Sequence, residues 1–399
     1  MKTGGARGPL CSRVLLGKIL GARINNLNFL PKVCVRMSEV KSIEARVREC
    51  LRNVNDPEIG RSLVDLDMLG SVQVGGGNAI TVTVQLPTTA YPRRERITQA
   101  VQAMLASKLS DVGAVEVHFD SKVKGKQSGG AIGLKVQNII AVGSGKGGVG
   151  KSTVAAALAV GLQMSGAKVG LMDADIYGPS LPHLFGVSGP NHRPEIVEQQ
   201  GPDGQTIRRI QPIDSHGLKI MSIGFLVGAD EPVIVRGPIL HRTIQQFLQE
   251  TAWGELDYLI IDLPPGTGDI ALTLSQLVGL AGAVVVCTPQ QLALLDAVKA
   301  INMFRKVKIP VLGVVENMTG EIFGRGGAKQ KAADMGVPFL GEVPIDARIR
   351  VNGDAGQIRD SFAADSPSRG YLINVCEQTA IQIARTLLET PSMPTLEIL

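Results

Sequence analysis

The sequence is poor in aromatic residues, which make up 4% of its 399 positions. Proteins that bind single-stranded nucleic acid without sequence preference stack the bases on aromatic side chains, so this scarcity argues against that class. Long apolar runs are also absent, because no run reaches the roughly 20 residues that a membrane-spanning helix needs. We therefore expect neither a nucleic-acid partner nor a membrane partner.

Cysteine pairs are missing as well. The chain has five cysteines, and no two of them stand in Cys-x-x-Cys spacing, which is the usual signature of a metal-binding or redox-active pair. A free cysteine is most often a small buried apolar residue, and we expect this of each cysteine in the folded part. Cys287 is the strongest alternative candidate for a ligand, because it ends an apolar run near the site predicted below. The cysteines are Cys11, Cys34, Cys50, Cys287 and Cys376.

The positive net charge comes from the first residues of the chain. Residues 1–37 hold seven Lys/Arg and no acidic residue, so their formal charge is +7. Because the whole chain carries +5, residues 38–399 carry −2. A start codon assigned too far upstream explains this basic leader, and we favour that interpretation because Met37 directly precedes a helix-like segment. An organelle-targeting peptide has the same composition and is the alternative. Scattered cysteines indicate a reducing compartment, so the cytoplasm is the expected location.

A glycine-rich loop is the most informative segment that is present. Residues 145–152 read Gly-Lys-Gly-Gly-Val-Gly-Lys-Ser and follow the apolar run 139–142. They match the pattern G-x-x-x-x-G-K-[ST] between a strand and a helix, which is the P-loop context. Glycines let backbone N–H groups approach phosphate oxygens, Lys151 would reach the β- and γ-phosphates, and the Ser152 hydroxyl would hold Mg²⁺. The loop therefore predicts ATP and Mg²⁺ as cofactors.

Aspartates end two further predicted strands. Asp173 and Asp175 follow the strand near 168–172, and Asp262 ends the run 256–262. The carboxyl ends of parallel strands form the ligand-binding edge of such sheets. We expect Asp262 to hold Mg²⁺, Asp173 to support the metal and Asp175 to act next to the attacking water. The alternative is that Asp173 and Asp175 are ordinary turn or N-cap residues.

Alternating strands and helices predict the fold class. We predict strands near residues 138–143, 168–172, 218–223, 257–262, 282–287, 311–316 and 339–343. This alternation predicts an α/β fold in which a doubly wound, mostly parallel sheet is covered by helices on both faces. Predicted helices at 40–53 and 94–108 around a hairpin predict a small N-terminal α/β domain. The expected division is a basic leader (1–37), a small α/β domain (38–120), a polar linker (121–136) and a P-loop NTPase domain (137–399).

Several motifs together resemble one family. They are the loop 145–152, Asp-Ala-Asp-Ile-Tyr-Gly-Pro-Ser at 173–180, Arg-Gly-Pro at 236–238, Asp-Leu-Pro-Pro-Gly-Thr-Gly-Asp at 262–269 and Val-Glu-Asn-Met at 315–318. This set resembles the Mrp/ApbC-type iron–sulfur cluster carrier ATPases. Residues 55–60 and 63–66 resemble the small iron–sulfur assembly domain that precedes the ATPase in many bacterial members. The resemblance implies a dimeric protein that binds and hydrolyses ATP and passes iron–sulfur clusters to apoproteins.

The resemblance also implies roles for individual residues. In the deviant P-loop ATPases related to MinD and ParA, a lysine at the position of Lys146 crosses the dimer interface and touches the partner's nucleotide. Together with the roles given above, this makes Lys146, Lys151 and Asp175 the expected catalytic residues. An asparagine at the position of Asn317 pairs with the adenine edge. The alternatives are a solvated lysine and a turn asparagine. The residues expected at the nucleotide are Gly145, Lys146, Gly147, Gly148, Val149, Gly150, Lys151, Ser152, Thr153 and Asn317, and those expected at the metal are Ser152, Asp173 and Asp262.

The sequence departs from this family at the cluster ligands. Family carriers have a Cys-x-x-Cys shortly after Glu-Asn-Met, but residues 319–327 read Thr-Gly-Glu-Ile-Phe-Gly-Arg-Gly-Gly. Tyr91 stands where the small domain usually has a cysteine, and a phenol is a poor substitute for a soft thiolate. Two hypotheses follow: a dimeric ATPase that carries or helps assemble iron–sulfur clusters, and a cluster-free nucleotide switch that acts as a scaffold or regulatory partner. A ParA-like partitioning ATPase is disfavoured by the near-neutral charge of residues 38–399.

Overall fold

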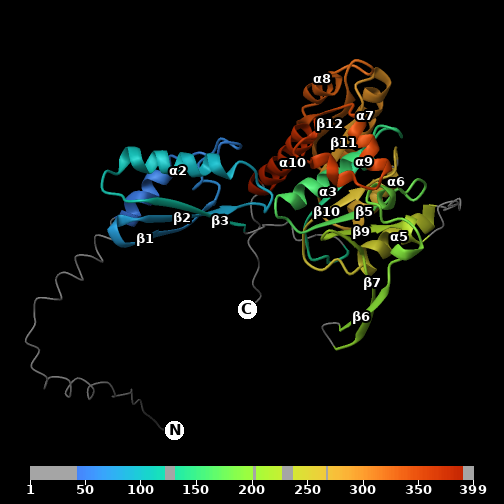
Figure 1. Ribbon diagram of the computed structural model, residues 1–399, viewed down its shortest axis with the longest axis horizontal. Helices are drawn as coiled ribbons and strands as arrows, with labels where there is room; N and C mark the ends of the chain where they lie inside the picture. The colour runs from blue at the N-terminus through green and yellow to red at the C-terminus, as the bar shows by residue number, and fades with distance from the viewer. Residues whose placement is uncertain (1–42, 122–130, 201–203, 227–236, 267, 390–399) are drawn as a thin grey trace, which may run out of the picture.

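The computed structural model describes residues 43–121, 131–200, 204–226, 237–266 and 268–389 (Figure 1). The predicted leader 1–37, most of the predicted linker and Arg236 lie outside these residues. Within them the chain forms a small N-terminal unit and a larger α/β unit, as Figure 1 shows. No helix in the described ranges is long and apolar enough to cross a membrane.

The small unit is a three-stranded sheet packed against helices. After a helix at 43–51 come β1 (Leu69–Val74), η1 (Gly76–Asn78), β2 (Ile80–Leu86), α2 (Arg94–Lys108) and β3 (Val115–Ser121). Strand β2 is central, antiparallel to β1 and parallel to β3. Its alternate residues are buried in a cluster with one face of α2, because side chains in a strand point to opposite faces in turn. The predicted small α/β unit is therefore confirmed.

The larger unit is built on an eight-stranded sheet in the order β13-β12-β11-β4-β10-β5-β9-β8. All neighbours are parallel except β8 and β9, which pair antiparallel. All of the strands predicted from residue 137 onward are present, so the mostly parallel sheet is confirmed. The strands are β4 (Val136–Ser144), β5 (Val169–Asp173), β8 (Ile213–Ser215), β9 (Leu218–Ser222), β10 (Leu256–Asp262), β11 (Leu280–Cys287), β12 (Val311–Thr319) and β13 (Phe339–Pro344).

Helices cover both faces of this sheet. Ile140 and Val142 of β4 pack into the cluster that contains α3 and α10, whereas Ile139 and Ala141 pack into the cluster that contains α5, α6 and α7. The run 139–142 is apolar throughout because both of its faces are buried. The helices are α3 (Lys151–Met164), α4 (Leu181–Leu184), α5 (Gly237–Glu250), α6 (Gly268–Leu277), α7 (Gln291–Lys306), α8 (Gly327–Asp334), α9 (Ala347–Asp354) and α10 (Arg369–Glu389). The shorter elements are η2 (Pro190–His192), η3 (Ile223–Phe225), η4 (Ile358–Phe362) and the hairpin strands β6 (Ile196–Gln200) and β7 (Thr206–Ile210).

The last helix connects the two units. Figure 1 shows α10 running from the larger unit toward the small one. Ala384 is buried in the apolar cluster of the small unit, and Leu388 packs against the same cluster. One Arg385 guanidinium nitrogen donates a hydrogen bond to the Glu58 carbonyl oxygen at 2.7 Å. The small unit is thus held by the C-terminal helix, far along the chain from its own residues.

Candidate functional site

The predicted P-loop follows β4 and leads into α3. Gly148 and Gly150 have φ angles of 78° and 79°, the left-handed region that favours glycine. A Cβ on Gly150 would lie 2.2 Å from the Asn317 amide nitrogen, and a Cβ on Gly145 would lie 2.1 Å from the Asp296 carbonyl oxygen. Side chains at these positions would therefore displace the loop from β12 and α7.

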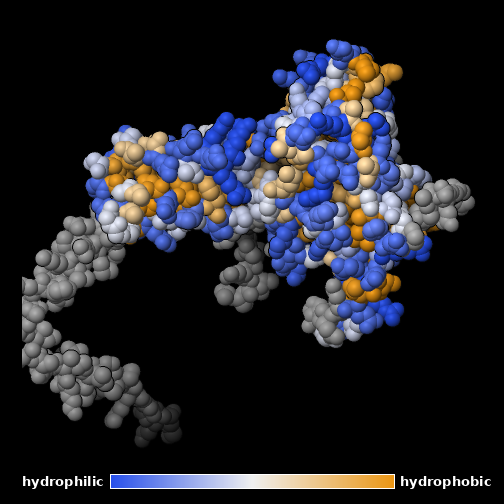
Figure 2. Space-filling model, viewed as in Figure 1, coloured by the Kyte–Doolittle hydropathy of each residue, from blue (hydrophilic) through white to orange (hydrophobic). Residues whose placement is uncertain are grey.

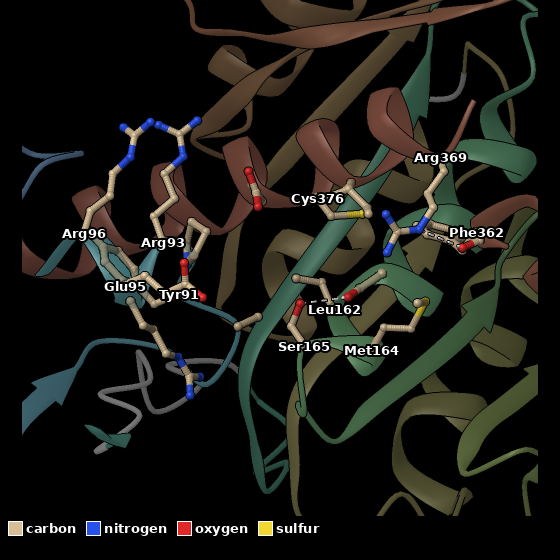
Figure 3. Close-up of a pocket in the computed structure, with 16 residues that line it drawn as sticks. Tyr91, Arg93, Glu95, Arg96, Leu162, Met164, Ser165, Phe362, Arg369 and Cys376 are labelled. Atoms are coloured by element: carbon tan, nitrogen blue, oxygen red, sulfur yellow. Dashed lines mark hydrogen bonds between the residues drawn. The ribbon is translucent and has the colours of Figure 1, made fainter. Parts of the chain in front are cut away.

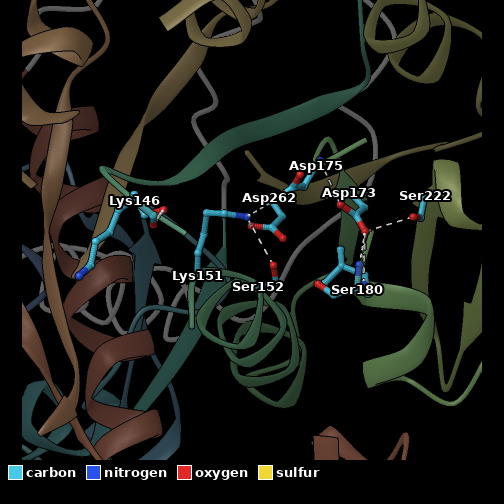
Figure 4. A network of polar contacts seen from close by, with 10 residues as sticks. Lys146, Lys151, Ser152, Asp173, Asp175, Ser180, Ser222 and Asp262 are labelled. Carbon is cyan, nitrogen blue, oxygen red and sulfur yellow. Dashed lines mark hydrogen bonds and ion pairs between the residues drawn. The ribbon is translucent and has the colours of Figure 1, made fainter. Parts of the chain in front are cut away.

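Four of the predicted catalytic and metal-binding residues meet at the start of α3 (Figure 4). Lys151 Nζ lies 2.6 Å from Asp262 Oδ1, 3.6 Å from Asp175 Oδ2 and 3.4 Å from the Ser152 hydroxyl oxygen. Parallel pairing places the end of β10 beside the end of β5, with Asp262 opposite Asp173. Strand order thus brings four predicted side chains, from three separate parts of the chain, to one edge of the sheet.

The Lys151 and Asp262 charges at the centre of this group are buried together. Asp262 is fully buried and Lys151 is 6% exposed. Burial raises the pKa of the Asp262 carboxyl, while the nearby Lys151 ammonium acts in the opposite direction. A buried charge without a partner is costly by several kcal/mol, roughly 3–5 when one member of a pair is removed. The pair therefore holds Lys151 inside the site.

One oxygen of this group suits a metal ion. Asp262 Oδ2 is buried and has no hydrogen-bond partner among the residues that the structure describes. An unsatisfied buried oxygen costs free energy, and Mg²⁺ or a water bound to it would satisfy this oxygen. Carboxylate and hydroxyl oxygens are the hard ligands that Mg²⁺ prefers. Asp262 and Ser152 therefore fit the metal predicted for them.

Asp173 is placed differently from its two acidic neighbours. Its carboxylate accepts hydrogen bonds from the backbone N–H groups of Asp175, Ser180 and Leu181. It also accepts one from the Ser222 hydroxyl at 3.1 Å. Burial, and then the charge of Asp262, raises the pKa of Asp173. Its contacts hold the loop that carries Asp175, and its predicted support of the metal stays a prediction.

Asn317 lies beneath the P-loop. It is buried near the end of β12, and its amide nitrogen donates a hydrogen bond to the Val149 carbonyl oxygen at 2.9 Å. This contact braces the loop from the neighbouring part of the sheet. The predicted contact with adenine is not tested by this geometry and stays a prediction.

Lys146 lies apart from the buried group. Its side chain is half-buried, and Figure 4 shows it directed away from Lys151 and Asp262. Gly147 and Gly148 beside it are exposed, so the tip of the loop faces outward. Its predicted contact with a partner's nucleotide stays a prediction.

Sequence reasoning missed one buried acid near the site. Glu316 is fully buried in β12, and its carboxylate accepts hydrogen bonds from the backbone N–H groups of Gly326 and Ala328. It thereby holds the segment 319–326 and the start of α8. An acid inside an apolar strand, followed by a glycine-rich turn, was the available signal.

Two of the three described cysteines are buried. Cys50 is half-buried in the small unit, whereas Cys287 and Cys376 are buried in the larger one. Burial raises the pKa of both the Cys287 and Cys376 thiols to about 12. No group of three or more His, Cys, Asp or Glu side chains in the described ranges could hold a metal ion. Their arrangement supports the structural interpretation of these three cysteines.

Tyr91 is a buried structural residue in this arrangement. Its hydroxyl donates a hydrogen bond to Asp56 Oδ1 at 2.7 Å. Burial, followed by the charge of Asp56, raises the pKa of Tyr91 well above its ordinary value. A neutral phenol is therefore the stable form, and it supplies no anionic ligand at the position where the family has a thiol.

Two family models match the chain, one for each unit. The model of the family described as NUBPL iron-transfer P-loop NTPase matches residues 135–380. The model of the family described as iron-sulfur cluster assembly protein matches residues 44–118.

Individual relatives are also similar to this chain in sequence. An iron-sulfur cluster carrier protein of Deinococcus radiodurans is 43% identical over 352 residues, which cover 86% of this chain and 96% of the relative. An iron-sulfur cluster transfer protein NUBPL of Dictyostelium discoideum is 46% identical over 242 residues, covering 58% of this chain and 72% of the relative. Among solved structures, a nucleotide-binding protein from Archaeoglobus fulgidus in complex with ADP is 40% identical, with a TM-score of 0.48, and the match covers 58% of this chain and 93% of that one.

Proposed function

The chain belongs to the family of NUBPL iron-transfer P-loop NTPases, and from this membership we propose that it binds ATP with Mg²⁺ and hydrolyses the ATP. We further propose that it acts as a homodimer that passes iron–sulfur clusters to apoproteins. The observation that carries the nucleotide part is the buried group of Lys151, Ser152, Asp175 and Asp262 under a glycine loop. Family membership favours cluster transfer over the cluster-free switch.

Nucleotide binding would exchange the partners of Lys151. Its ammonium is held by Asp262 at 2.6 Å and by Asp175 at 3.6 Å. Phosphate oxygens compete for such a cation through charge-assisted hydrogen bonds. Once Lys151 turns to the phosphates, Asp262 and Ser152 can hold Mg²⁺. The bound ion supplies positive charge to the β- and γ-phosphates.

Asp175 is the residue that we propose next to the attacking water. Its side chain is 14% exposed, whereas that of Asp262 is fully buried. Its backbone N–H is fixed by Asp173. A carboxylate that is anchored by its backbone and reaches the edge of the site can orient a water molecule. Asp173 then contributes by positioning the loop.

Exposed apolar side chains beside the P-loop support a homodimer. Gly145 packs tightly on α7, and the side chains of Leu292 and Leu295 on that helix are 72% and 57% exposed. Ile322, before α8, is 77% exposed. Figure 2 shows apolar side chains gathered in the region of α7 and α8. We propose that a second copy covers this face and that Lys146, at the outward-facing tip of the loop, reaches that copy.

The cluster is cargo in this proposal, and we assign it neither Cys287 nor Cys376 as a ligand. Deprotonating a buried thiol of raised pKa is unfavourable near neutral pH, and the thiolate is the form that binds iron. The ligands would come from elsewhere in the dimer or from the client apoprotein. We also propose that residues 38–120 and 137–399 act as separate domains and that the protein is cytoplasmic.

Anaerobic reconstitution tests the carrier proposal. The full chain is incubated with iron and sulfide, and the cluster is read by visible absorbance and by transfer to an apo-ferredoxin with ATP or ADP present. We expect a stoichiometric cluster per dimer and transfer that depends on the nucleotide. The matched double variant Cys287→Ala/Cys376→Ala should keep the cluster. Absence of a stoichiometric cluster on the dimer would rule out direct carriage.

A further inference from the structure

A cavity lies at the junction of the two units, away from the P-loop. It has a volume of about 530 Å³. The small unit contributes residues 90–96, and the larger unit contributes the C-terminal end of α3 and the first half of α10. Helix α3 has 14 residues, so its P-loop end and its cavity end are separated by roughly 20 Å at 1.5 Å per residue. This cavity is therefore distinct from the nucleotide site.

Arginines are concentrated around this cavity although residues 38–399 carry a net charge of −2. The lining cations are Arg93, Arg94, Arg96 and Arg369, and the lining anions are Glu95 and Glu377. The formal charge of the lining is therefore positive. Both units supply guanidinium groups to the lining of the same cavity.

Two of these arginines already have a carboxylate partner. Glu58 Oε1 lies 2.7 Å from a guanidinium nitrogen of Arg93 and 3.9 Å from one of Arg96. Arg94 and Arg369 differ, because they donate hydrogen bonds to the carbonyl oxygens of Thr89 and Phe362. In the described part of the chain, neither has a carboxylate within 4.0 Å. A neutral carbonyl does not compensate a cation, so neither guanidinium is paired with a carboxylate at contact distance.

The arrangement of the walls suggests the shape of a ligand. Figure 3 shows Arg93 and Arg96 on one side and Arg369 on the other, with Leu162 and Cys376 between them. Apolar side chains, including Met164, Phe362 and Ile373, also line the cavity. Small-molecule sites commonly have volumes of about 300–1,000 Å³ and a few polar groups in an apolar lining.

We propose that the junction cavity binds a small organic polyanion through Arg94 and Arg369. The shared chemistry is a compact molecule with more than one carboxylate or phosphate group, which planar guanidinium groups bind in a bidentate manner. Such a ligand contacts the small unit through Arg94 and the larger unit through Arg369. It therefore holds the two units together, in addition to the contact between Arg385 and Glu58. This site does not depend on the proposed handling of ATP or clusters.

Titration calorimetry on the full chain in magnesium-free buffer tests the proposal with two probes, citrate and inorganic pyrophosphate. We expect one of them to bind with one site per chain. Arg94→Gln and Arg369→Gln should each weaken binding at least about tenfold, because a hydrogen bond to a charged group contributes roughly 1.5–3 kcal/mol. Preference for citrate identifies a carboxylate ligand, and preference for pyrophosphate identifies a phosphate ligand. Arg369→Lys should retain part of the affinity, because it keeps the charge but loses the planar fork.

The matched control is Arg350→Gln, since Arg350 is an exposed arginine of α9 that pairs with Asp354 and does not line the cavity. It should leave binding unchanged, and a thermal melt of each variant verifies folding. The proposal is overturned if neither probe binds at millimolar concentration or if all three Gln variants weaken binding equally. Pyrophosphate binding that is insensitive to Arg94 and Arg369 would place that probe elsewhere and would also overturn it. A hexaglutamate peptide that binds where both small probes fail would indicate an acidic protein segment instead.

Discussion

Replacing Lys151 by methionine should destabilise the larger unit even without nucleotide. The substitution keeps most of the apolar stem but removes the cation that lies 2.6 Å from Asp262 and 3.6 Å from Asp175. Asp262 is fully buried and would lose its closest partner. Removing one member of a buried pair typically costs about 3–5 kcal/mol of unfolding free energy. We expect a loss of this size at pH 8.

The assay is urea unfolding followed by the fluorescence of Trp253, the single tryptophan of the sequence. Trp253 is buried in the larger unit, where its indole N–H donates a hydrogen bond to the Phe247 carbonyl oxygen at 3.1 Å. The signal therefore reports unfolding of the unit that carries the site. Lys135→Met is the matched control, because Lys135 is exposed and faces an equally exposed Glu255. Such a surface pair contributes only about 0–1 kcal/mol.

The pH dependence of this loss has a defined sign. In the native protein the pKa of Asp262 is already raised by burial, and Lys151 acts to lower it. Without Lys151 the pKa rises further, so the folded state binds a proton more tightly than the unfolded state does. Stability then falls as the pH rises from the unfolded value near 3.8 through the folded pKa, and the variant should recover stability at pH 5. Equal stability of Lys151→Met and Lys135→Met at pH 8, or a larger deficit at pH 5, would refute this reasoning.

Three further predictions concern the same region. Lys146→Ala should strongly reduce ATP turnover while leaving ATP affinity within about twofold; unchanged turnover, measured by phosphate release, would contradict a role across the dimer. Gly150→Ala should weaken ATP binding by about tenfold or more, since its Cβ would lie 2.2 Å from the Asn317 amide nitrogen. Gly166 has the same left-handed backbone but lies in open space, so Gly166→Ala should retain ATP affinity in the same titration. Glu316→Ala should lower the free energy of unfolding by about 2–3 kcal/mol and expose the segment 319–326 to proteolysis, because two backbone N–H groups lose their acceptor. Equal cleavage rates in the variant and the unaltered protein would contradict this.

Part of the nucleotide site could be predicted from local patterns in the sequence. The loop 145–152 combines glycines, a lysine and a serine in contiguous positions, and its flanking strand and helix are confirmed. Asp262 and Asp175 follow apolar runs, so the geometry of a parallel sheet predicts that they meet at one edge. Their direct contacts with the Lys151 ammonium were not predicted and come from the structure.

Other contacts could not be predicted, because they join residues that no local pattern connects. Asn317 and Val149 are 168 positions apart, and their hydrogen bond depends on the order in which strands pair. Asp173 has the same local signature as Asp175, yet its carboxylate is taken up by the backbone of the following loop and by Ser222. A similar sequence position thus leads to two different surroundings.

The class of fold, the P-loop and the acids that end the neighbouring strands can all be read from the residues alone, since these depend on periodicity and on residue types at short spacing. Only the tertiary structure decided which of those acids pairs with the lysine and that Cys287 and Cys376 are buried apart. The structure alone also revealed the cavity between Arg94 and Arg369, residues that are separated by most of the chain. Pairing and burial are properties of neighbours in space, and strand order or helix packing brings together residues that are far apart in the chain.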